Sequence, residues 1–406
     1  MRRIISGYLS LVVLFSFIFI SCSKDAEIPT AISQSATSNG TASLDKIAYG
    51  SQTVVATDLN QPRGLIFGPD QMLYVSESGT GGCISTVGQC EQVPPPIGPY
   101  LGGNNGSITK INISQGTSQG QSKINTNFPS TQTAATSGGD LTSISSVAFY
   151  QGNLYALLSG AGCSHGHPEI PNGILQVNND GSWHQIADIS SFLKANPVAQ
   201  PEAEDFEPDG DLYSMTVVDN YLYFIESNHG ELDRYNFNTG SIERVVDISK
   251  TQGHIVPTAI AFKDGYFYVG NLTTIPFPIG AAKIMKISRD GQSLSTYATG
   301  FTTVLGLTFD NSGNLYVLET SIGNGQPPFF APNTGRIMRI TNGDVNNVTE
   351  VTSGLNFPTA MTLGPDGNLY VSNNGFASAP GTGQVVMVSI SSGGCGCNNG
   401  QTIAGK

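Results

Sequence analysis

Charged residues are scarce in this chain, and several familiar catalytic motifs are missing. Only 12% of the residues are Asp, Glu, Lys or Arg. No Gly-x-Ser-x-Gly elbow, His-Glu-x-x-His helix or phosphate-binding loop occurs, which argues against the usual nucleophilic and zinc-protease chemistries. The net charge of −12 also argues against nucleic acid or acidic lipid headgroups as partners, because both bind cationic patches.

Glycine and aromatic residues are abundant. The chain has 49 glycines, 15 tyrosines and 19 phenylalanines, but a single tryptophan. This composition is typical of a turn-rich secreted β protein, so we expect few helices. Residues 51–390 suffice for one large all-β domain or two smaller ones.

The first 21 residues have the pattern of a lipoprotein signal peptide. Basic Met1-Arg2-Arg3 precedes an uncharged apolar run over residues 8–20, which is shorter than the roughly 20 residues of a membrane span and ends at Ser21-Cys22. We expect lipidation of Cys22, a flexible Ser/Thr/Ala-rich linker over 22–50, and anchoring at the outer membrane on its periplasmic or cell-surface face. The alternative is ordinary secretion with a chance cysteine.

Five further cysteines follow. Cys83 and Cys90 lie close together in a Gly-rich loop, and we expect them to form a disulfide outside the reducing cytosol. The pairing of Cys163, Cys395 and Cys397 stays open, because the count is odd. The last two belong to a Gly/Cys-rich tail over residues 391–406.

One pattern occurs six times: an apolar strand, a tight turn, and a strand that contains a tyrosine. The repeated tyrosines are Tyr74, Tyr155, Tyr223, Tyr268, Tyr316 and Tyr370, spaced 81, 68, 45, 48 and 54 residues apart. This is a propeller period with insertions in the first two blades, and further strands follow each hairpin. We predict an all-β, six-bladed propeller of four-stranded antiparallel blades over 51–390, closed by an N-terminal strand that completes the last blade. A β-sandwich would not explain the sixfold repeat.

Several segments resemble a known family. These are the Asn-Gln-Pro-Arg-Gly-Leu-Ile-Phe-Gly-Pro-Asp run at 60–70, the Gly-rich loop at 77–83, the Pro-Phe-Pro-Ile-Gly-Ala run within 269–282, and residues 300–307. Together they resemble the ScyD/ScyE secreted propellers, and more distantly the NHL-repeat and gluconolactonase-like propellers. The resemblance implies a six-bladed fold and a secreted location, and it implies no particular reaction.

Polar residues recur where the second strand of each hairpin ends. Three places after the repeated tyrosines stand Glu77, Leu158, Glu226, Asn271, Glu319 and Asn373. In a propeller these positions lie around one mouth of the central channel, so Glu77, Glu226, Asn271, Glu319 and Asn373 are candidate ligands for a divalent cation, above all Ca²⁺ with its six to eight oxygens. The gluconolactonase-like resemblance implies that such a metal would polarise a substrate. The alternative is that each residue only bonds the adjoining turn.

Other candidates lie at the same mouth and in the loops. The channel-mouth candidates for binding are Arg63, Tyr213, Asn228, His229, Thr258 and Thr359. In blade two, His165 and His167 with Glu169 have a spacing that can chelate Zn²⁺ or Cu²⁺, or else belong to an ordinary polar loop. The acidic run at 202–211 is either a solvated loop or a Ca²⁺ site.

Long insertions at 78–105 and 156–172 favour a recognition surface, because a bare scaffold would need only short turns. We therefore expect a lipid-anchored propeller that binds a small molecule, glycan or protein through its loop-bearing face. The alternative is a metal-dependent hydrolase or lactonase at the central channel, and the sequence leaves open whether the protein is an enzyme.

Overall fold

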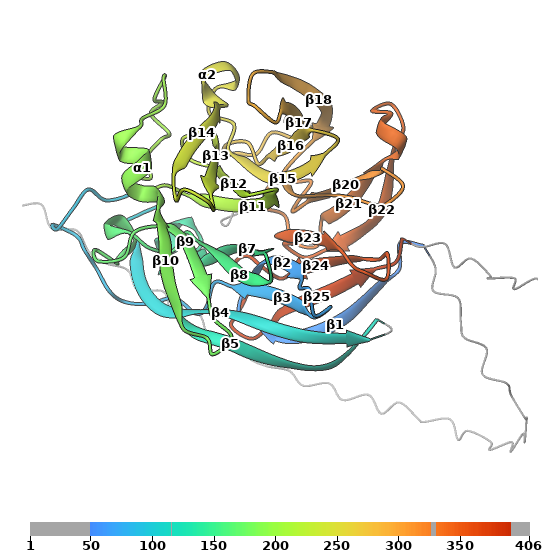
Figure 1. Ribbon diagram of the computed structural model, residues 1–406, viewed down its shortest axis with the longest axis horizontal. Coiled ribbons are helices and arrows are strands. Elements are labelled where there is room, and N and C mark those ends of the chain that lie inside the picture. The colour runs from blue at the N-terminus through green and yellow to red at the C-terminus, as the bar shows by residue number, and fades with distance from the viewer. Residues whose placement is uncertain (1–48, 115, 326–329, 391–406) are drawn as a thin grey trace, which may run out of the picture. The chain divides into compact units, whose positions relative to one another are not determined.

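The computed structural model describes residues 49–390, apart from 115 and 326–329. These residues form six antiparallel sheets, five of four strands and one of five, arranged as the blades of a propeller (Figure 1). The predicted all-β, six-bladed propeller is confirmed. The expected lipidation site Cys22, the expected signal peptide and the tail over 391–406 lie outside the described residues.

Each blade starts beside the central channel and runs outward (Figure 1). Blade one contains β2 (Pro62–Phe67), β3 (Leu73–Glu77), β4 (Leu101–Ser114), β5 (Thr117–Gln132) and β6 (Leu141–Thr142), and blade two contains β7 (Ile144–Tyr150), β8 (Asn153–Leu158), β9 (Gly173–Val177) and β10 (Trp183–Asp188). Blade three contains β11 (Leu212–Val218), β12 (Tyr221–Glu226), β13 (Glu231–Asn236) and β14 (Ile242–Asp247), and blade four contains β15 (Pro257–Lys263), β16 (Tyr266–Asn271), β17 (Ala282–Ser288) and β18 (Leu294–Phe301). Blade five contains β19 (Val304–Phe309), β20 (Leu315–Glu319), β21 (Gly335–Ile340) and β22 (Val348–Leu355), and blade six contains β23 (Ala360–Leu363), β24 (Leu369–Asn373), β25 (Gly383–Val388) and β1 (Gln52–Leu59).

Helices are few and short in the described part of the chain, and they lie in connections between strands. They are α1 (Ile189–Ala195), α2 (Ser249–Gln252) and the 3-10 turns η1 (Ala135–Ser137), η2 (Cys163–His165) and η3 (Thr341–Gly343). Within the described residues, no helix has the length and hydrophobicity needed to cross a bilayer.

In three of the hairpins the repeated tyrosine bonds an aspartate of its own turn, Tyr74 with Asp70, Tyr316 with Asp310 and Tyr370 with Asp366. In the last blade, the Tyr370 hydroxyl donates to Asp366 at 3.0 Å, and Asp366 also accepts from the Asn368 amide. Gly367 between them has φ 79°, a conformation that strongly favours glycine. The buried tyrosine therefore ties its own turn to the blade.

Apolar side chains fill each of the six interfaces between neighbouring blades. The six clusters contain the repeated tyrosines together with Leu, Ile and Val side chains from both blades. Trp183 of blade two packs near Phe128 of blade one, with ring centroids 5.9 Å apart, and so lies between the two blades. Burial between blades therefore holds the ring together.

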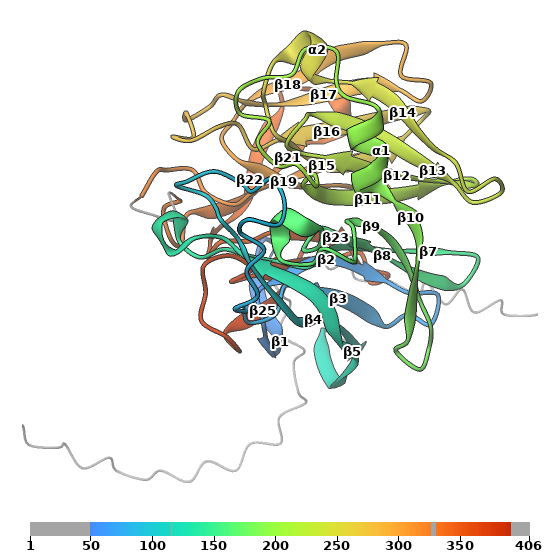
Figure 2. The ribbon, with the colours of Figure 1, turned by 90° about the vertical axis from the view of Figure 1, so that its left-hand side faces the viewer.

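The ring closes by pairing the two ends of the described chain. Strand β1 pairs with β25 from Gln52 opposite Val388 to Leu59 opposite Gly383. Both views show the blue β1 beside the red β25 (Figures 1 and 2). The predicted closure by the N-terminal strand is confirmed, and it removes the free sheet edges that an open ring would expose.

Candidate functional site

The inner strands of all six blades begin around one mouth of the central channel. There a cavity of about 140 Å³ receives one residue from the start of each inner strand or the residue beside it: Arg63, Ser145, Tyr213, Thr258, Leu305 and Thr359. Thr142 of β6 and Leu212 of β11 also line it, and the remaining lining residues come from the connections: Asp140, Asp211, Ser227, Val256, Leu272, Phe330 and Phe376. One position from each of the six blades therefore lies at this cavity.

Arg63 is anchored in the wall of this cavity. Its Nε donates to Ser78 Oγ at 2.9 Å, and its Nη2 donates to Asp140 Oδ1 at 2.8 Å and to the Leu141 carbonyl. Burial opposes its charge, but Asp140 more than offsets that effect and raises the pKa of Arg63. The guanidinium thus forms a buried ion pair with a fixed position.

Tyr213 forms the floor of the cavity. From blade three, its hydroxyl donates to the Thr359 carbonyl of blade six, on the opposite side of the ring, at 3.0 Å. Tyr213, with Ser145 and Leu305, also lines a second channel cavity of about 310 Å³. Burial raises the pKa of Tyr213, so the hydroxyl stays protonated and can donate. The mouth is therefore a pocket with a floor.

Asp211 is the titratable group whose charge changes nearest to neutral pH in this cavity. Its Oδ1 accepts from Ser159 Oγ at 3.1 Å. Burial, followed by the charge of Glu226, raises the pKa of Asp211 to about 6. A carboxyl of this kind can exchange a proton near neutral pH or pair with a bound cation.

Phenylalanines from the last three blades make the opposite, apolar wall. Phe330 stacks on Phe277 with centroids 4.4 Å apart and meets Phe376 edge-on at 5.2 Å. Phe357 and Leu272 complete this cluster. The loops of blades four to six are therefore held by aromatic packing.

A buried polar network holds the loops of the first three blades. The Tyr100 hydroxyl donates to Glu207 Oε1, and His165 Nε2 lies 3.4 Å from Glu207 Oε2. Ser164 Oγ donates to Asp209 Oδ2 at 2.7 Å and also contacts His165 Nδ1. Burial and the charge of Asp211 raise the pKa of Glu207 to about 8, while burial lowers that of His165 to about 4. At neutral pH the two side chains are thus mainly uncharged.

A disulfide joins two of these loops, and it is not the one that the spacing predicted. Cys90 pairs with Cys163, 73 residues away, while Cys83 is free and exposed. The expected Cys83–Cys90 bond is therefore wrong. The loop between β3 and β4 folds against the loop between β8 and β9, where the Thr86 hydroxyl donates to the Cys163 carbonyl. This packing brings Cys90 to Cys163 with Cα atoms 6.3 Å apart.

The five proposed metal ligands use side-chain oxygens for bonds within their own blades. Each accepts a hydrogen bond from a backbone amide: Glu77 from Asn60, Glu226 from Asp211, Asn271 from Lys283, Glu319 from Thr302 and Asn373 from Asn356. The three glutamates also form ion pairs with Lys123, His229 and Arg336, respectively. These bonds correspond to the turn-bonding role that the sequence left open.

The structure divides the other candidates. Arg63, Tyr213, Thr258 and Thr359 line the cavity, whereas Asn228 and His229 are not among its lining residues. Asn228 accepts from the Glu207 amide at 2.8 Å. His229 Nδ1 lies 3.2 Å from Glu226, whose charge overcomes the effect of burial and raises the pKa of His229 to about 9. Both therefore support the connection into blade three.

His165 and His167 are buried, but the structure does not bring them to a common site with Glu169. His167 Nε2 lies 2.9 Å from the Ser130 carbonyl, while Glu169 is exposed. The two histidines thus contact different partners: His167 contacts strand β5 of blade one, and His165 contacts Glu207.

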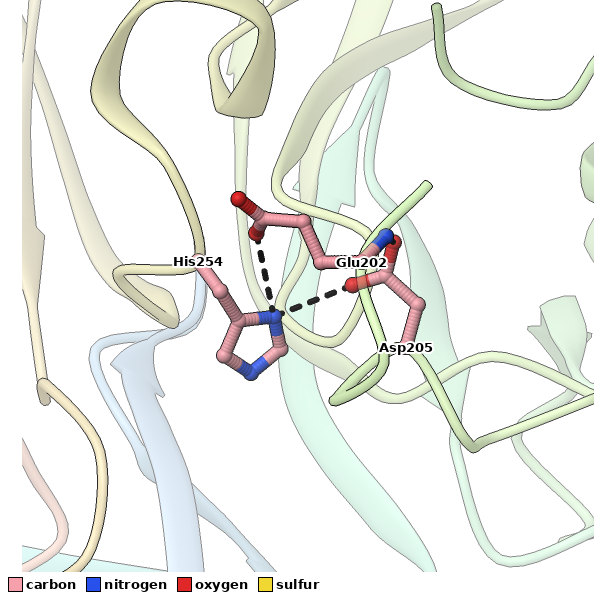
Figure 3. Close-up of side chains that lie close together, drawn as sticks. All are labelled: Glu202, Asp205 and His254. Carbon is pink, nitrogen blue, oxygen red and sulfur yellow. Dashed lines mark hydrogen bonds and ion pairs between the residues drawn. The ribbon is translucent and has the colours of Figure 1, made fainter. Parts of the chain in front are cut away.

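Part of the acidic run does meet a histidine. Among the described residues, Glu202, Asp205 and His254 form a group whose ligand atoms all lie within 4.8 Å of one another (Figure 3). His254 Nδ1 lies 3.0 Å from Asp205 Oδ1 and 3.8 Å from Glu202 Oε2. The arrangement could hold a divalent cation, and its imidazole suits Zn²⁺ better than Ca²⁺.

Sequence reasoning missed Asp140, Phe330 and Phe376 as parts of the channel mouth. All three lie in connections that vary from blade to blade, so the repeat gives no aligned position for them. Asp211 was visible only as a member of the acidic run. Its position directly before the inner strand β11 is the signal that could have singled it out.

Neither a family model nor a curated protein matches the sequence. Solved structures do share the fold. A protein of unknown function from Bacteroides thetaiotaomicron is similar at 12% identity, with a TM-score of 0.51 over 84% of this chain and 73% of the other. The calcium-binding protein regucalcin from Agrobacterium tumefaciens has 12% identity and a TM-score of 0.51 over 84% and 94%. A putative glucose dehydrogenase from Thermus thermophilus has 14% identity and a TM-score of 0.51 over 83% and 99%.

Proposed function

We propose that this chain is a lipid-anchored extracytoplasmic propeller of the ScyD/ScyE type that binds a small ligand at the channel mouth. The observation that carries the proposal is the cavity of about 140 Å³ lined by all six blades and floored by Tyr213. It combines fixed polar groups with an apolar wall, which is the usual make-up of a small-molecule site.

Saturation-transfer NMR with benzylamine, benzyl alcohol and phenylacetate tests the site. An apolar cavity of about 150 Å³ holds benzene, so a benzyl compound matches the space. We expect transfer from the wild type to at least one of the three compounds, and loss of that transfer in Leu305→Phe, which narrows the cavity. Leu101→Phe, at an exposed position on β4, is the matched control. No transfer to any compound would count against the channel mouth as a binding site.

The anchor is the second part of the proposal. The signal-peptide pattern before Cys22 and the ScyD/ScyE resemblance over residues 51–390 support it. Labelled palmitate should be incorporated by the wild type and not by Cys22→Ser, and the variant should leave the membrane fraction. Retention of the label in Cys22→Ser would contradict lipidation at this residue.

A metal-dependent hydrolase or lactonase is the second candidate. The lining carboxyl of Asp211 favours it, because a pKa of about 6 suits a general acid or base. Ca²⁺ is the cofactor expected from the sequence, and the regucalcin neighbour is described as calcium-binding. Hydrolysis of gluconolactone by the wild type, lost in Asp211→Asn and in chelator, would support this candidate. Equal rates for wild type and Asp211→Asn would exclude Asp211 as the catalytic group.

A further inference from the structure

The two walls of the channel-mouth cavity differ in chemistry. Blades one to three contribute Arg63, Asp140, Asp211 and hydroxyl groups, whereas blades four to six contribute mainly Val256, Leu272, Leu305, Phe330 and Phe376. A ligand that fills both sides must therefore carry a polar group at one end and an apolar body at the other.

Arg63 is poorly placed to receive an anion. Three of its hydrogen bonds go to Ser78, Asp140 and the Leu141 carbonyl. An anionic ligand would have to displace Asp140 from this buried pair, and it would leave that carboxylate without its partner. Breaking a buried ion pair in this way is strongly unfavourable.

Asp211, unlike Arg63, keeps a side-chain atom that can bind a ligand. Ser159 Oγ supplies the hydrogen bond to its Oδ1, and no described residue donates to its Oδ2. The charges of Glu226 and Arg63 both act on this carboxyl, but each of these residues is already paired, Glu226 with His229 and Arg63 with Asp140. Beside the neutral Arg63–Asp140 pair, the ionised Asp211 thus leaves the polar wall with an excess of negative charge.

We infer that the channel mouth binds an organic ammonium ion, with the cationic group against Asp211 and the apolar body against Phe330 and Phe376. The inference rests on the proposed ligand-binding function and names the ligand class. The rigid aromatic wall adds surface on which the apolar body packs favourably.

A bare metal ion fits this cavity less well. Ca²⁺ takes six to eight oxygen ligands, and Mg²⁺ demands an octahedral oxygen shell. The lining from blades four to six is mainly hydrocarbon, and its only side-chain oxygens are the Thr258 and Thr359 hydroxyls, which already donate to backbone carbonyls. An organic cation instead gains from both walls at once.

Calorimetric titration of the isosteric pair benzylamine and benzyl alcohol, together with the slightly larger anion phenylacetate, tests the inference. For the wild type we expect benzylamine to bind at least tenfold more tightly than benzyl alcohol, and phenylacetate to bind most weakly. Asp211→Asn should remove the preference for the amine, because the amide keeps the size of the side chain and its bond to Ser159. Phe330→Leu should weaken the amine and the alcohol by the same factor. Asp219→Asn, at an exposed site whose side chain is 64% accessible, should change nothing.

The outcomes separate the two proposals. Equal affinity for amine and alcohol, or a preference for phenylacetate, would overturn the ammonium inference and leave a binding site of another class. Binding of none of the compounds would overturn both. A retained amine preference in Asp211→Asn would show that another group supplies the negative charge.

Discussion

The loops above blades one to three and those above blades four to six are held together by different physical means. The first set relies on the hydrogen bond from Tyr100 to Glu207, on the 3.4 Å contact between His165 and Glu207, with one of these residues in each of the three connections, and on the Cys90–Cys163 disulfide. The second set relies on the packing of Phe277, Phe330 and Phe376, again one from each connection. The polar half should therefore respond to pH and reductant, while the aromatic half should be insensitive to both.

The largest difference in stability between the two halves should come from loss of the Cys90–Cys163 disulfide. Replacing Cys90 and Cys163 by serine frees a loop of 73 residues, which should lower the free energy of unfolding by about 4 kcal/mol in the chain-entropy model. Guanidinium titration of the double variant measures it, with Cys83→Ser as the control that should change stability by less than about 0.5 kcal/mol. Equal loss in the control would mean that Cys83 takes part in the bond.

Phe330→Ala should destabilise the aromatic half. The side chain is 6% exposed and stacks on Phe277, so its truncation should cost about 3 kcal/mol. Phe330→Leu, which keeps most of the apolar volume, should cost about 1 kcal/mol. Both losses should be the same with and without reductant. A reductant-dependent loss would show that the two halves are coupled.

The sequence predicted the shared architecture and missed what differs between blades. The tyrosine repeat gave the blades, the closure by β1 and the inner-strand positions Arg63, Tyr213, Thr258 and Thr359, because these features recur with a period. The repeat also located the residues at the strand ends, such as Glu226, but it did not show what they bind. A carboxylate oxygen can accept a hydrogen bond from a backbone amide or bind a metal ion, and the sequence alone does not distinguish the two roles. Cys90 and Phe330 lie in insertions, where spatial neighbours are distant in sequence.

The two halves should also differ, by a smaller amount, in how their stability depends on pH. The pKa of Glu207 is raised from 4.5 to about 8, so in this range the native state binds more protons than the unfolded state and stability falls as pH rises. Above pH 6.5 the lowered pKa of His165 no longer contributes, whereas the raised pKa of His229 acts in the same direction as that of Glu207.

We therefore expect the free energy of unfolding to drop between pH 6.5 and 8, with Glu207 contributing at most about 2 kcal/mol. Glu207→Gln should flatten the slope, because glutamine cannot lose a proton. Glu169→Gln, at an exposed position, should leave the slope unchanged. An unaltered slope in Glu207→Gln would assign the pH dependence to His229 and its neighbours instead.

The smallest expected effect on stability is that of a metal ion bound where the two halves meet. Glu202 and Asp205 lie in the connection into blade three, and His254 lies in the connection into blade four, so an ion bound by all three would link the halves (Figure 3). At ten times its dissociation constant, a ligand that binds only the native state adds about 1.4 kcal/mol to stability. Thermal unfolding in Zn²⁺ and in Ca²⁺ should therefore show a modest rise in midpoint, greater for Zn²⁺ because of the imidazole, and the rise should vanish in His254→Gln. Glu91→Gln, at an exposed residue remote in sequence from the three, should retain it. No rise with either ion would mean that the hydrogen bond that His254 Nδ1 donates to Asp205 already satisfies this cluster, and that the halves are joined by the blades alone.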